Sequence, residues 1–366
     1  MKRRDFFKSA TAVTAGAAGA SALATPAISQ GMTEWVCVSA FGRAGLLGSA
    51  LEKFAEDVKT MTDGKLVITP YHDGELVGGL ESMDAVQSGT AQMGYGAPYY
   101  WEGKSDSISF VAAMPYGLNV QEQNAWLYYG DGIAMADKLA YNPLGVKFLP
   151  MGNTGNQMGG WYAKEINTVD DLSGLKFRMP GLGGEVLKTF GVNVILLSGS
   201  DTLPALTSGQ IDGTEWIGPA ADLGAGFFRV VNNYYYPGWH EPATVLDGFF
   251  DMAAWEALDD QSRAAVERAA ASTNLWILSQ FQAVNNAALQ TLVNEHDVNL
   301  LPYSDELLQA IGERTPDVLS ERAKSSPEAT ELYNSLVSWR STMVEWSGIS
   351  EGKFMQARTS ANFSTI

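Results

Sequence analysis

The sequence predicts an α/β protein of two lobes with a helical C-terminal region, and three observations support this prediction. Strand-like apolar runs alternate with helix-like segments between residues 34 and 96, and a second alternation of this kind runs from residue 146 to 213. Between Leu258 and Asp297 the chain has no Pro or Gly and carries Ala, Leu and Val at helical spacing. Two such units predict two mostly parallel sheets with helices on their faces, and therefore two lobes.

The first unit is expected to hold three strands and two helices. Short apolar runs predict the strands, at 34–41, 66–72 and 92–96. Apolar residues at helical spacing, each set followed by a glycine, predict helices at 46–58 and 80–89.

The second unit repeats this pattern. Its predicted strands are 146–150, 175–179 and 192–197, and its helical segments are a turn near 170–172 and helices at 183–191 and 202–213. Asp259 is a good N-cap for the long C-terminal helix, which is long enough to run across both lobes. Further helices are predicted at 304–312, 316–324 and 327–346, and the residues after Gly348 are expected to be polar and irregular.

The composition excludes several classes of protein. The 366 residues include 24 Lys and Arg against 41 Asp and Glu, a net charge of −17, so the surface repels a nucleic-acid backbone. The single cysteine, Cys37, excludes an intrachain disulfide and is expected to be a buried thiol. The chain has no HExxH, GxSxG, GxxxxGK[ST] or GxGxxG motif, and this absence argues against a zinc protease, a hydrolase elbow and a nucleotide site.

The first 29 residues are interpreted as a twin-arginine export signal. MKRRDFFK is followed by an apolar stretch of small residues from Ala10 to Ala24, and cleavage fits after Ala24 or Ser29. No later segment has eighteen uninterrupted apolar residues, so we expect a protein that acts outside the cytoplasm and is not embedded in a membrane.

A family resemblance is carried by five stretches between Asn153 and Met252. They read GGWYAKEI, DDLSGLKFR, GLGGEVL, IDGTEW and YYYPGWHEP. Together they resemble the solute receptors of tripartite ATP-independent periplasmic (TRAP) transporters, in the branch that binds 2-oxo and 2-hydroxy monocarboxylates.

The resemblance implies a type II-like periplasmic binding protein fold, with strands and a long helix crossing between the lobes. We expect the first lobe at 30–127 and 214–252, the second at 128–213 and 253–310, and a C-terminal helical region at 311–366. The implied partners are a small organic-acid anion and the TRAP membrane subunits. The family also allows a homodimer through the C-terminal helix.

Arg178 is the predicted anchor for the ligand's carboxylate. It ends a predicted strand, where a guanidinium can present a planar fork of donors that matches a carboxylate. An ion pair with a nearby acid is the alternative, and the surrounding motif favours the ligand role.

Glu215 leaves a charge deficit in such a cleft. The charges of Arg178, Glu215 and a monocarboxylate sum to −1, and a bound cation removes this deficit. Oxygen ligands suit Na⁺ or Ca²⁺. The family pattern implies that the cation contacts the Gln157 side-chain oxygen, the Glu215 carboxylate and the Trp216 carbonyl, with the ligand's carboxylate and 2-oxygen completing the shell.

Further residues are assigned to the cleft. Tyr100 aligns with the family's cleft tyrosine, with a core aromatic as its alternative, and Phe41 and Trp216 are expected to make the cleft aromatic and small. Asp247 lies in an apolar run and is a candidate fourth metal ligand, which would favour Ca²⁺ over Na⁺. His240 is expected to be a hydrogen-bonded residue in an aromatic wall rather than a catalytic base.

Two functions other than a transport receptor are alternatives for this fold and cleft. A secreted hydrolase or lyase needs an activated nucleophile or base that the sequence does not offer. A sensor module on the same lobes would differ only in its partners.

Overall fold

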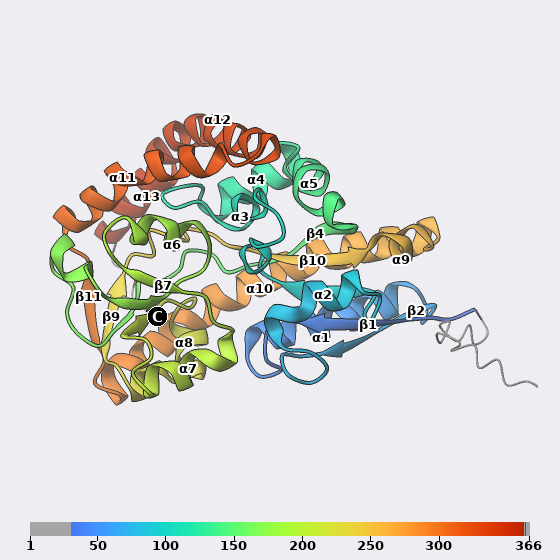
Figure 1. The fold of residues 1–366 in the computed structure, drawn as a ribbon, viewed down its shortest axis with the longest axis horizontal. Coiled ribbons are helices and arrows are strands. Elements are labelled where there is room, and N and C mark those ends of the chain that lie inside the picture. Colours follow the sequence, from blue (N-terminus) through green and yellow to red (C-terminus); the bar gives the residue numbers. More distant parts are fainter. Residues whose placement is uncertain (1–30, 362, 364–366) are drawn as a thin grey trace, which may run out of the picture.

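The computed structural model describes residues 31–361 and 363, so the predicted export signal lies outside the described residues. The chain forms two lobes, each built on its own sheet (Figure 1). Within the described residues, no helix combines the length and apolar content that crossing a membrane requires.

The first lobe is built on a five-stranded sheet in the order β2-β1-β3-β10-β4. Its strands are β1 (Thr33–Ser39), β2 (Leu66–Tyr71), β3 (Met93–Gly96), β4 (Val146–Asn153) and β10 (Val245–Asp251). Strand β1 pairs in parallel with β2 and β3, whereas β10 runs antiparallel between β3 and β4. The first predicted strands are therefore confirmed, but the sheet is mixed because a strand from late in the chain is inserted into it.

The second lobe is built on a six-stranded sheet in the order β11-β9-β5-β8-β6-β7. Its strands are β5 (Gly160–Tyr162), β6 (Lys176–Arg178), β7 (Asn193–Ile195), β8 (Gly213–Thr214), β9 (Asn233–Tyr236) and β11 (Asn299–Pro302). Strand β6 is parallel to β7 and β8, and β5 is antiparallel to β8 and β9.

These pairings differ from the expected lobe boundaries. Strand β4 belongs to the first sheet although residues 128–213 are expected in the second lobe, and β9 belongs to the second sheet although residues 214–252 are expected in the first. We therefore propose that the chain crosses between the lobes after β4 and again after β9.

Helices cover both sheets. Those before residue 260 are α1 (Leu46–Met61), α2 (Ser82–Gln87), α3 (Ile108–Ala112), α4 (Val120–Tyr129), α5 (Gly132–Ala136), α6 (Gly181–Lys188), α7 (Gly199–Thr207), α8 (Pro219–Ala225) and α9 (Met252–Glu256). The long helix α10 (Asp260–Glu295) packs on α1 and β4 of the first lobe and on α8 of the second, as predicted, and Asp259 caps it by accepting from the Ser262 amide.

The C-terminal helices differ from the prediction in two ways. Helix α11 (Asp305–Ala323) runs unbroken through Pro316, where two helices were expected. Five buried residues spaced four apart continue on both sides of the proline, so packing of this stripe outweighs the lost backbone hydrogen bond; they are Leu307, Ile311, Thr315, Leu319 and Ala323. After α12 (Pro327–Ile349), an exposed helix α13 (Glu351–Ala357) occupies the tail that was expected to be irregular.

Candidate ligand and metal site

The two central charges of the site are brought together by parallel strands of the second lobe. Arg178 ends β6, and Glu215 follows β8 directly. Arg178 stands opposite Thr214 in this pairing, so the next residue lies beside the guanidinium. Both side chains are only 1% exposed. The predicted meeting of a guanidinium and an acid in the interior is therefore present.

Arg178 is held by several groups. Its Nη1 forms an ion pair with the Glu215 carboxylate, and its Nη2 donates to the Leu197 carbonyl at 3.2 Å and to the Tyr100 hydroxyl at 3.4 Å. Its guanidinium carbon lies 5.1 Å from the centre of the Trp216 ring. The alternative role of Arg178, an ion pair with a nearby acid, is therefore present, and the acid is Glu215, which is itself a residue of the proposed site.

Glu215 keeps one oxygen without a hydrogen-bond partner among the described residues. This atom, Oε2, is buried and lies 3.5 Å from Nε2 of His240. Burial raises the pKa of Glu215 to about 7, although Arg178 opposes the rise. A buried carboxylate with a free oxygen is suited to accept a cation.

Gln157, like Glu215, keeps a buried oxygen without a hydrogen-bond partner among the described residues. Its Nε2 donates to Glu241 at 2.8 Å and to the hydroxyls of Thr154 and Thr244, both at 3.2 Å. Its Oε1 is buried and has no partner among the residues described. The amide donor is therefore fully used, and the amide oxygen is left free for a ligand.

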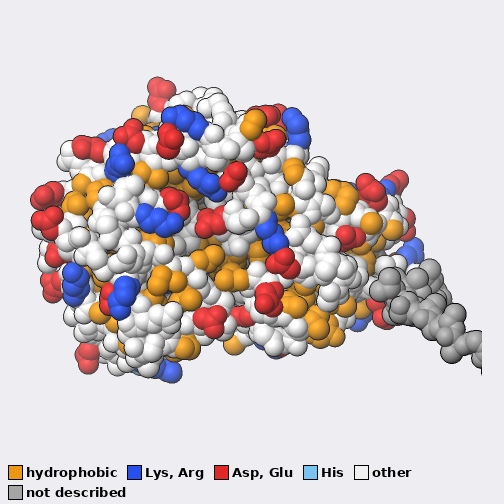
Figure 2. Space-filling view, in the orientation of Figure 1, with side chains coloured by type: hydrophobic (Ala, Val, Ile, Leu, Met, Phe, Trp, Pro, Cys, Tyr) orange, Lys and Arg blue, Asp and Glu red, His pale blue; other side chains and the backbone are white. Residues whose placement is uncertain are grey.

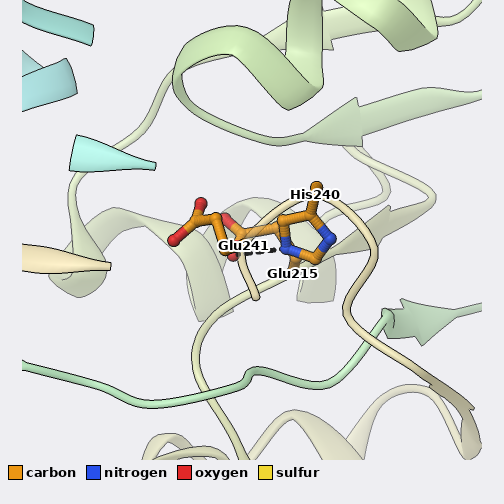
Figure 3. Close-up of side chains that lie close together, drawn as sticks. All are labelled: Glu215, His240 and Glu241. Atoms are coloured by element: carbon orange, nitrogen blue, oxygen red, sulfur yellow. Dashed lines mark ion pairs between the residues drawn. The ribbon is translucent and has the colours of Figure 1, made fainter. Parts of the chain in front are cut away.

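Glu241 is the site residue that the sequence analysis missed. Ligand atoms of Glu215, His240 and Glu241 lie within 4.8 Å of one another, and Figure 3 shows the three side chains close together. Burial, followed by repulsion from Glu215, raises the pKa of Glu241 to about 7. The YYYPGWHEP stretch contains Glu241, and an acid directly after an aromatic Pro-Gly turn was the available signal.

His240 was predicted to be a satisfied hydrogen-bonding residue, and this prediction is wrong for the described structure. Neither ring nitrogen has a hydrogen-bond partner among the described side chains and backbone, and burial lowers the pKa of His240 to about 4. A neutral ring adds no charge to the cluster at neutral pH.

Asp247 does not reach this cluster. One of its oxygens, Oδ2, accepts from the Trp101 indole at 3.0 Å and from the Tyr141 hydroxyl at 2.6 Å. Asp247 lies within β10, where neighbouring aromatic side chains cover it. Its other oxygen, Oδ1, is buried and has no hydrogen-bond partner among the described residues. Asp247 is nevertheless absent from the group formed by Glu215, His240 and Glu241, so we propose Glu241 as the second acid of the metal site, and a metal-ligand role of Asp247 stays a prediction.

Aromatic side chains of the first lobe close over these charges. Tyr100 packs against Tyr99 and Phe41, with ring centres 5.1 and 6.1 Å apart. The Tyr99 hydroxyl donates to Glu241 at 3.3 Å, while the Tyr100 hydroxyl accepts from Arg178. Burial raises the pKa of Tyr100 to about 12, so this hydroxyl keeps its proton and can donate to a bound anion. Tyr100 and Phe41 of the first lobe thus lie beside Arg178 of the second lobe, as the sequence predicted for residues of one cleft.

The donor set fits a hard cation. Gln157 Oε1 and Glu215 Oε2 are buried oxygens without a hydrogen-bond partner among the described residues, and ligand atoms of Glu215, Glu241 and the neutral His240 ring lie within 4.8 Å of one another, with no sulfur in the set. Carboxylate and amide oxygens are the ligands that Na⁺ and Ca²⁺ accept.

Comparisons with known proteins agree with this arrangement. Residues 40–325 match the family described as bacterial extracellular solute-binding protein, family 7 (DctP). The monocarboxylate 2-oxoacid-binding periplasmic protein of Nostoc sp. is 38% identical over 357 residues, which cover 96% of this chain and 97% of that protein.

Solved structures with 30% sequence identity or more have the same fold. A TRAP solute-binding protein from Pseudoalteromonas atlantica, with bound sodium and pyruvate, has a TM-score of 0.86 and 32% identity over 89% of this chain and 99% of that one. Another, from Bordetella bronchiseptica, has a TM-score of 0.87 and 30% identity over 90% and 98%; it is a mixed-occupancy dimer with calcium and picolinate in one site. This chain belongs to the DctP family of bacterial extracellular solute-binding proteins, the solute receptors of TRAP transporters.

Proposed function

We propose that this receptor binds a small 2-oxo or 2-hydroxy monocarboxylate together with a cation and delivers it to the TRAP membrane subunits. One observation carries the proposal: a buried guanidinium, two buried carboxylates and a free amide oxygen converge where the two lobes meet. The bound pyruvate of the Pseudoalteromonas relative and the printed name of the Nostoc relative support the same ligand class.

Each residue has a role that its position supports. Arg178 would hold the ligand's carboxylate with its fork of donors, and Tyr100 would donate to a ligand oxygen. Gln157, Glu215 and the Trp216 carbonyl would hold the cation. A carboxylate with an adjacent oxo or hydroxyl oxygen can chelate this cation through a five-membered ring, which a plain fatty acid cannot do.

Glu241 changes the charge count in favour of calcium. Arg178 contributes +1, and Glu215, Glu241 and the ligand contribute −1 each, so the site without a metal carries −2. A divalent ion brings this sum to zero, whereas Na⁺ leaves −1 in a buried volume. This count applies where both carboxyls are ionised, and burial raises the pKa of each to about 7. We therefore propose Ca²⁺ as the preferred cation above about pH 7, whereas at lower pH a retained proton on one carboxyl lets Na⁺ balance the site.

Titration calorimetry tests this proposal directly. Pyruvate and lactate should bind the purified protein in calcium, more weakly in sodium, and not after chelation in a sodium-free buffer. Acetate, which lacks the second oxygen, is the matched control and should bind at least tenfold more weakly. Unchanged pyruvate affinity after removal of both cations would refute a metal-bridged ligand.

The cellular setting is part of the proposal. We propose that residues 1–29 direct export and that the mature receptor acts in the periplasm. The intact mass of the protein recovered from the periplasm would show cleavage near Ala24 or Ser29, and an uncleaved chain in the cytoplasm would contradict it.

A homodimer through the C-terminal helices is also proposed. Helices α12 and α13 expose Trp346, Ile349 and Phe354, at 60%, 68% and 63%, and a cluster of exposed apolar residues of this kind is typical of an interface. Light scattering after size exclusion should give twice the chain mass for wild type and a single chain mass for Ile349→Asp. A wild-type monomer would contradict this proposal without affecting the ligand site.

A further inference from the structure

Asp222 on α8 is a buried acid that the ligand site described above does not use. Asp and Glu side chains are spread over the face of the molecule in Figure 2, where water solvates them, whereas Asp222 is only 1% exposed. A carboxylate that leaves water is costly unless donors occupy its oxygens, so the donors of Asp222 show what its burial stabilises.

Four donors surround this carboxylate, two on each oxygen. Its Oδ2 accepts from the Trp161 indole at 2.9 Å and from the Tyr234 hydroxyl at 2.7 Å. These two buried rings come from β5 and β9 and stack with their centres 4.0 Å apart, so they fix the carboxylate relative to the second sheet. Its Oδ1 accepts from the backbone amides of Ile217 and Gly218, at 3.1 and 3.0 Å. The carboxylate thus joins the sheet to the segment that follows Trp216.

The carbonyls of this segment are bonded except at one residue. The Glu215 carbonyl accepts from the Thr214 hydroxyl at 2.7 Å, and the Ile217 carbonyl accepts from the Met158 amide at 2.9 Å. Among the described residues, no backbone amide donates to the Trp216 carbonyl, which lies between them. This is the carbonyl that the proposed function assigns to the cation.

The geometry of the peptide bond connects these observations. The peptide between Trp216 and Ile217 is trans and planar, so its C=O and its N–H point in opposite directions. Because Asp222 holds the N–H, it also sets the direction of the carbonyl, which points away from Asp222. A hydrogen bond from the N–H to an anion polarises the same peptide and makes the carbonyl oxygen a stronger ligand for a cation.

We propose that Asp222 is a positioning residue of the ligand site, which holds the peptide between Trp216 and Ile217 so that its carbonyl is presented to the cation. This inference rests on the proposed function, since it requires the Trp216 carbonyl to be a cation ligand. Met158, which donates to the Ile217 carbonyl, directly follows Gln157, so the same contacts support a second proposed ligand. Groups that orient metal ligands in this way change metal affinity about 10- to 100-fold.

Two substitutions separate the position of the carboxylate from its charge. Asp222→Asn removes the charge but keeps an oxygen for the amides of Ile217 and Gly218, because its NH₂ group can donate to the Tyr234 hydroxyl, which turns to accept. Asp222→Glu keeps the charge but carries the carboxylate one methylene further, away from those amides. In calorimetry with calcium at fixed pyruvate, Asp222→Asn should stay within about threefold of wild type, and Asp222→Glu should bind calcium at least about tenfold more weakly.

Tyr234→Phe is the matched control. It removes the 2.7 Å bond to Oδ2 of Asp222 but leaves both amide bonds in place. Its free energy of unfolding in urea should fall, while its calcium affinity stays within about twofold of wild type. Unchanged calcium affinity in Asp222→Glu would overturn the proposal in favour of a role in stability alone. A loss in Asp222→Asn without a loss in Asp222→Glu would overturn it in favour of a role of the charge.

Two further measurements do not rely on calcium affinity. In the metal-free wild type, hydrogen exchange followed by NMR should show the amides of Ile217 and Gly218 protected at least about a hundredfold, and exchange at the rate of an unstructured peptide would overturn the proposal. Terbium, which takes oxygen ligands as calcium does, reports its bound waters through luminescence lifetimes in H₂O and D₂O. Asp222→Glu should hold an additional water on terbium where the carbonyl has withdrawn, and a hydration equal to that of wild type would overturn the proposal.

The outcomes separate this inference from the proposed function. Failure of the wild type to bind calcium with any 2-oxo acid would overturn both. Wild-type calcium affinity in Asp222→Glu would overturn the positioning role of Asp222 and leave the proposed function intact.

Discussion

Replacement of Glu241 by Gln separates the site that the structure supports from the one that the sequence suggested. The change removes one charge but keeps an oxygen that can accept from Gln157 and Thr244. Asp247→Asn is the matched control, because it removes a buried charge of the same kind from the residue that the sequence offered as a candidate fourth metal ligand.

The magnitude follows from burial and charge. Burial raises the pKa of Glu241 from 4.5 to about 7, so its ionised form costs the metal-free fold about 3 kcal/mol above pH 7, at 1.36 kcal/mol for each unit of pKa. Glu241→Gln removes this cost and should stabilise the metal-free protein. The same change should weaken calcium binding by about 2–4 kcal/mol, roughly 30- to 1,000-fold, because an anionic ligand is lost from a buried site.

The assay measures these two effects separately. Thermal or urea unfolding without metal gives the stability, and calorimetry with calcium at fixed pyruvate gives the affinity. Burial also raises the pKa of Asp247, to about 6, so in Asp247→Asn the removed cost of a buried charge offsets the weaker bonds from Trp101 and Tyr141. We expect little change in stability and a calcium affinity within about threefold of wild type. Strong loss of calcium affinity in Asp247→Asn and none in Glu241→Gln would refute the reasoning.

Three further predictions concern binding of the ligand's carboxylate, the pH dependence of calcium binding and a contact between the two lobes. Arg178→Lys should weaken pyruvate binding at least tenfold by calorimetry, because an ammonium cannot replace the bidentate fork, and wild-type affinity would remove Arg178 from the site. Burial raises the pKa of Glu215 and Glu241 to about 7, so these carboxyls hold protons in the metal-free protein that calcium must displace. Their contribution to the stability of the metal-free fold is present below about pH 4.5 and is lost as the pH rises through 7. The thermal shift produced by calcium should therefore be larger at pH 8 than at pH 5.5, and equal shifts would contradict linkage. Ser200→Ala removes a 2.7 Å bond to Asp73 across the lobes and should weaken pyruvate binding about fivefold, about 1 kcal/mol, while unchanged affinity would show that the contact does not favour closure.

Local patterns in the sequence were sufficient to predict part of the fold and the core of the site. Helical spacing after Asp259 predicted the long helix α10. The strand that ends in Arg178 predicted a guanidinium at the end of that strand, and the neighbouring strand β8 places Glu215 beside it. Both inferences depend on short stretches of chain whose geometry follows from local patterning.

Other features could not be predicted because they depend on contacts between distant segments. The insertion of β10 between β3 and β4 has no local signal, and neither has the membership of β4 in the first sheet and of β9 in the second, which is where the sheets differ from the expected lobe boundaries. Asp247 shows the same limit at the level of one side chain: its partner Tyr141 lies 106 residues away, so the sequence could not show that its carboxylate was already bonded. Glu241 lies within the irregular segment between β9 and β10, where no periodicity indicates which way a side chain points.

The same charges that identify the site also explain how closure is coupled to binding. In the closed arrangement, Glu215 and Glu241 are buried with raised pKa values, and Gln157 and Glu215 each keep a buried oxygen without a partner among the described residues. We expect these groups to regain solvent if the lobes separate, in which case the arrangement without ligand carries a cost that an open form avoids. A ligand anion and a cation satisfy those groups only when residues of both lobes surround them, and this difference in free energy shifts the population toward the closed form. A receptor with a neutral, fully bonded cleft would close without its ligand, and the membrane subunits could then no longer distinguish loaded from empty protein.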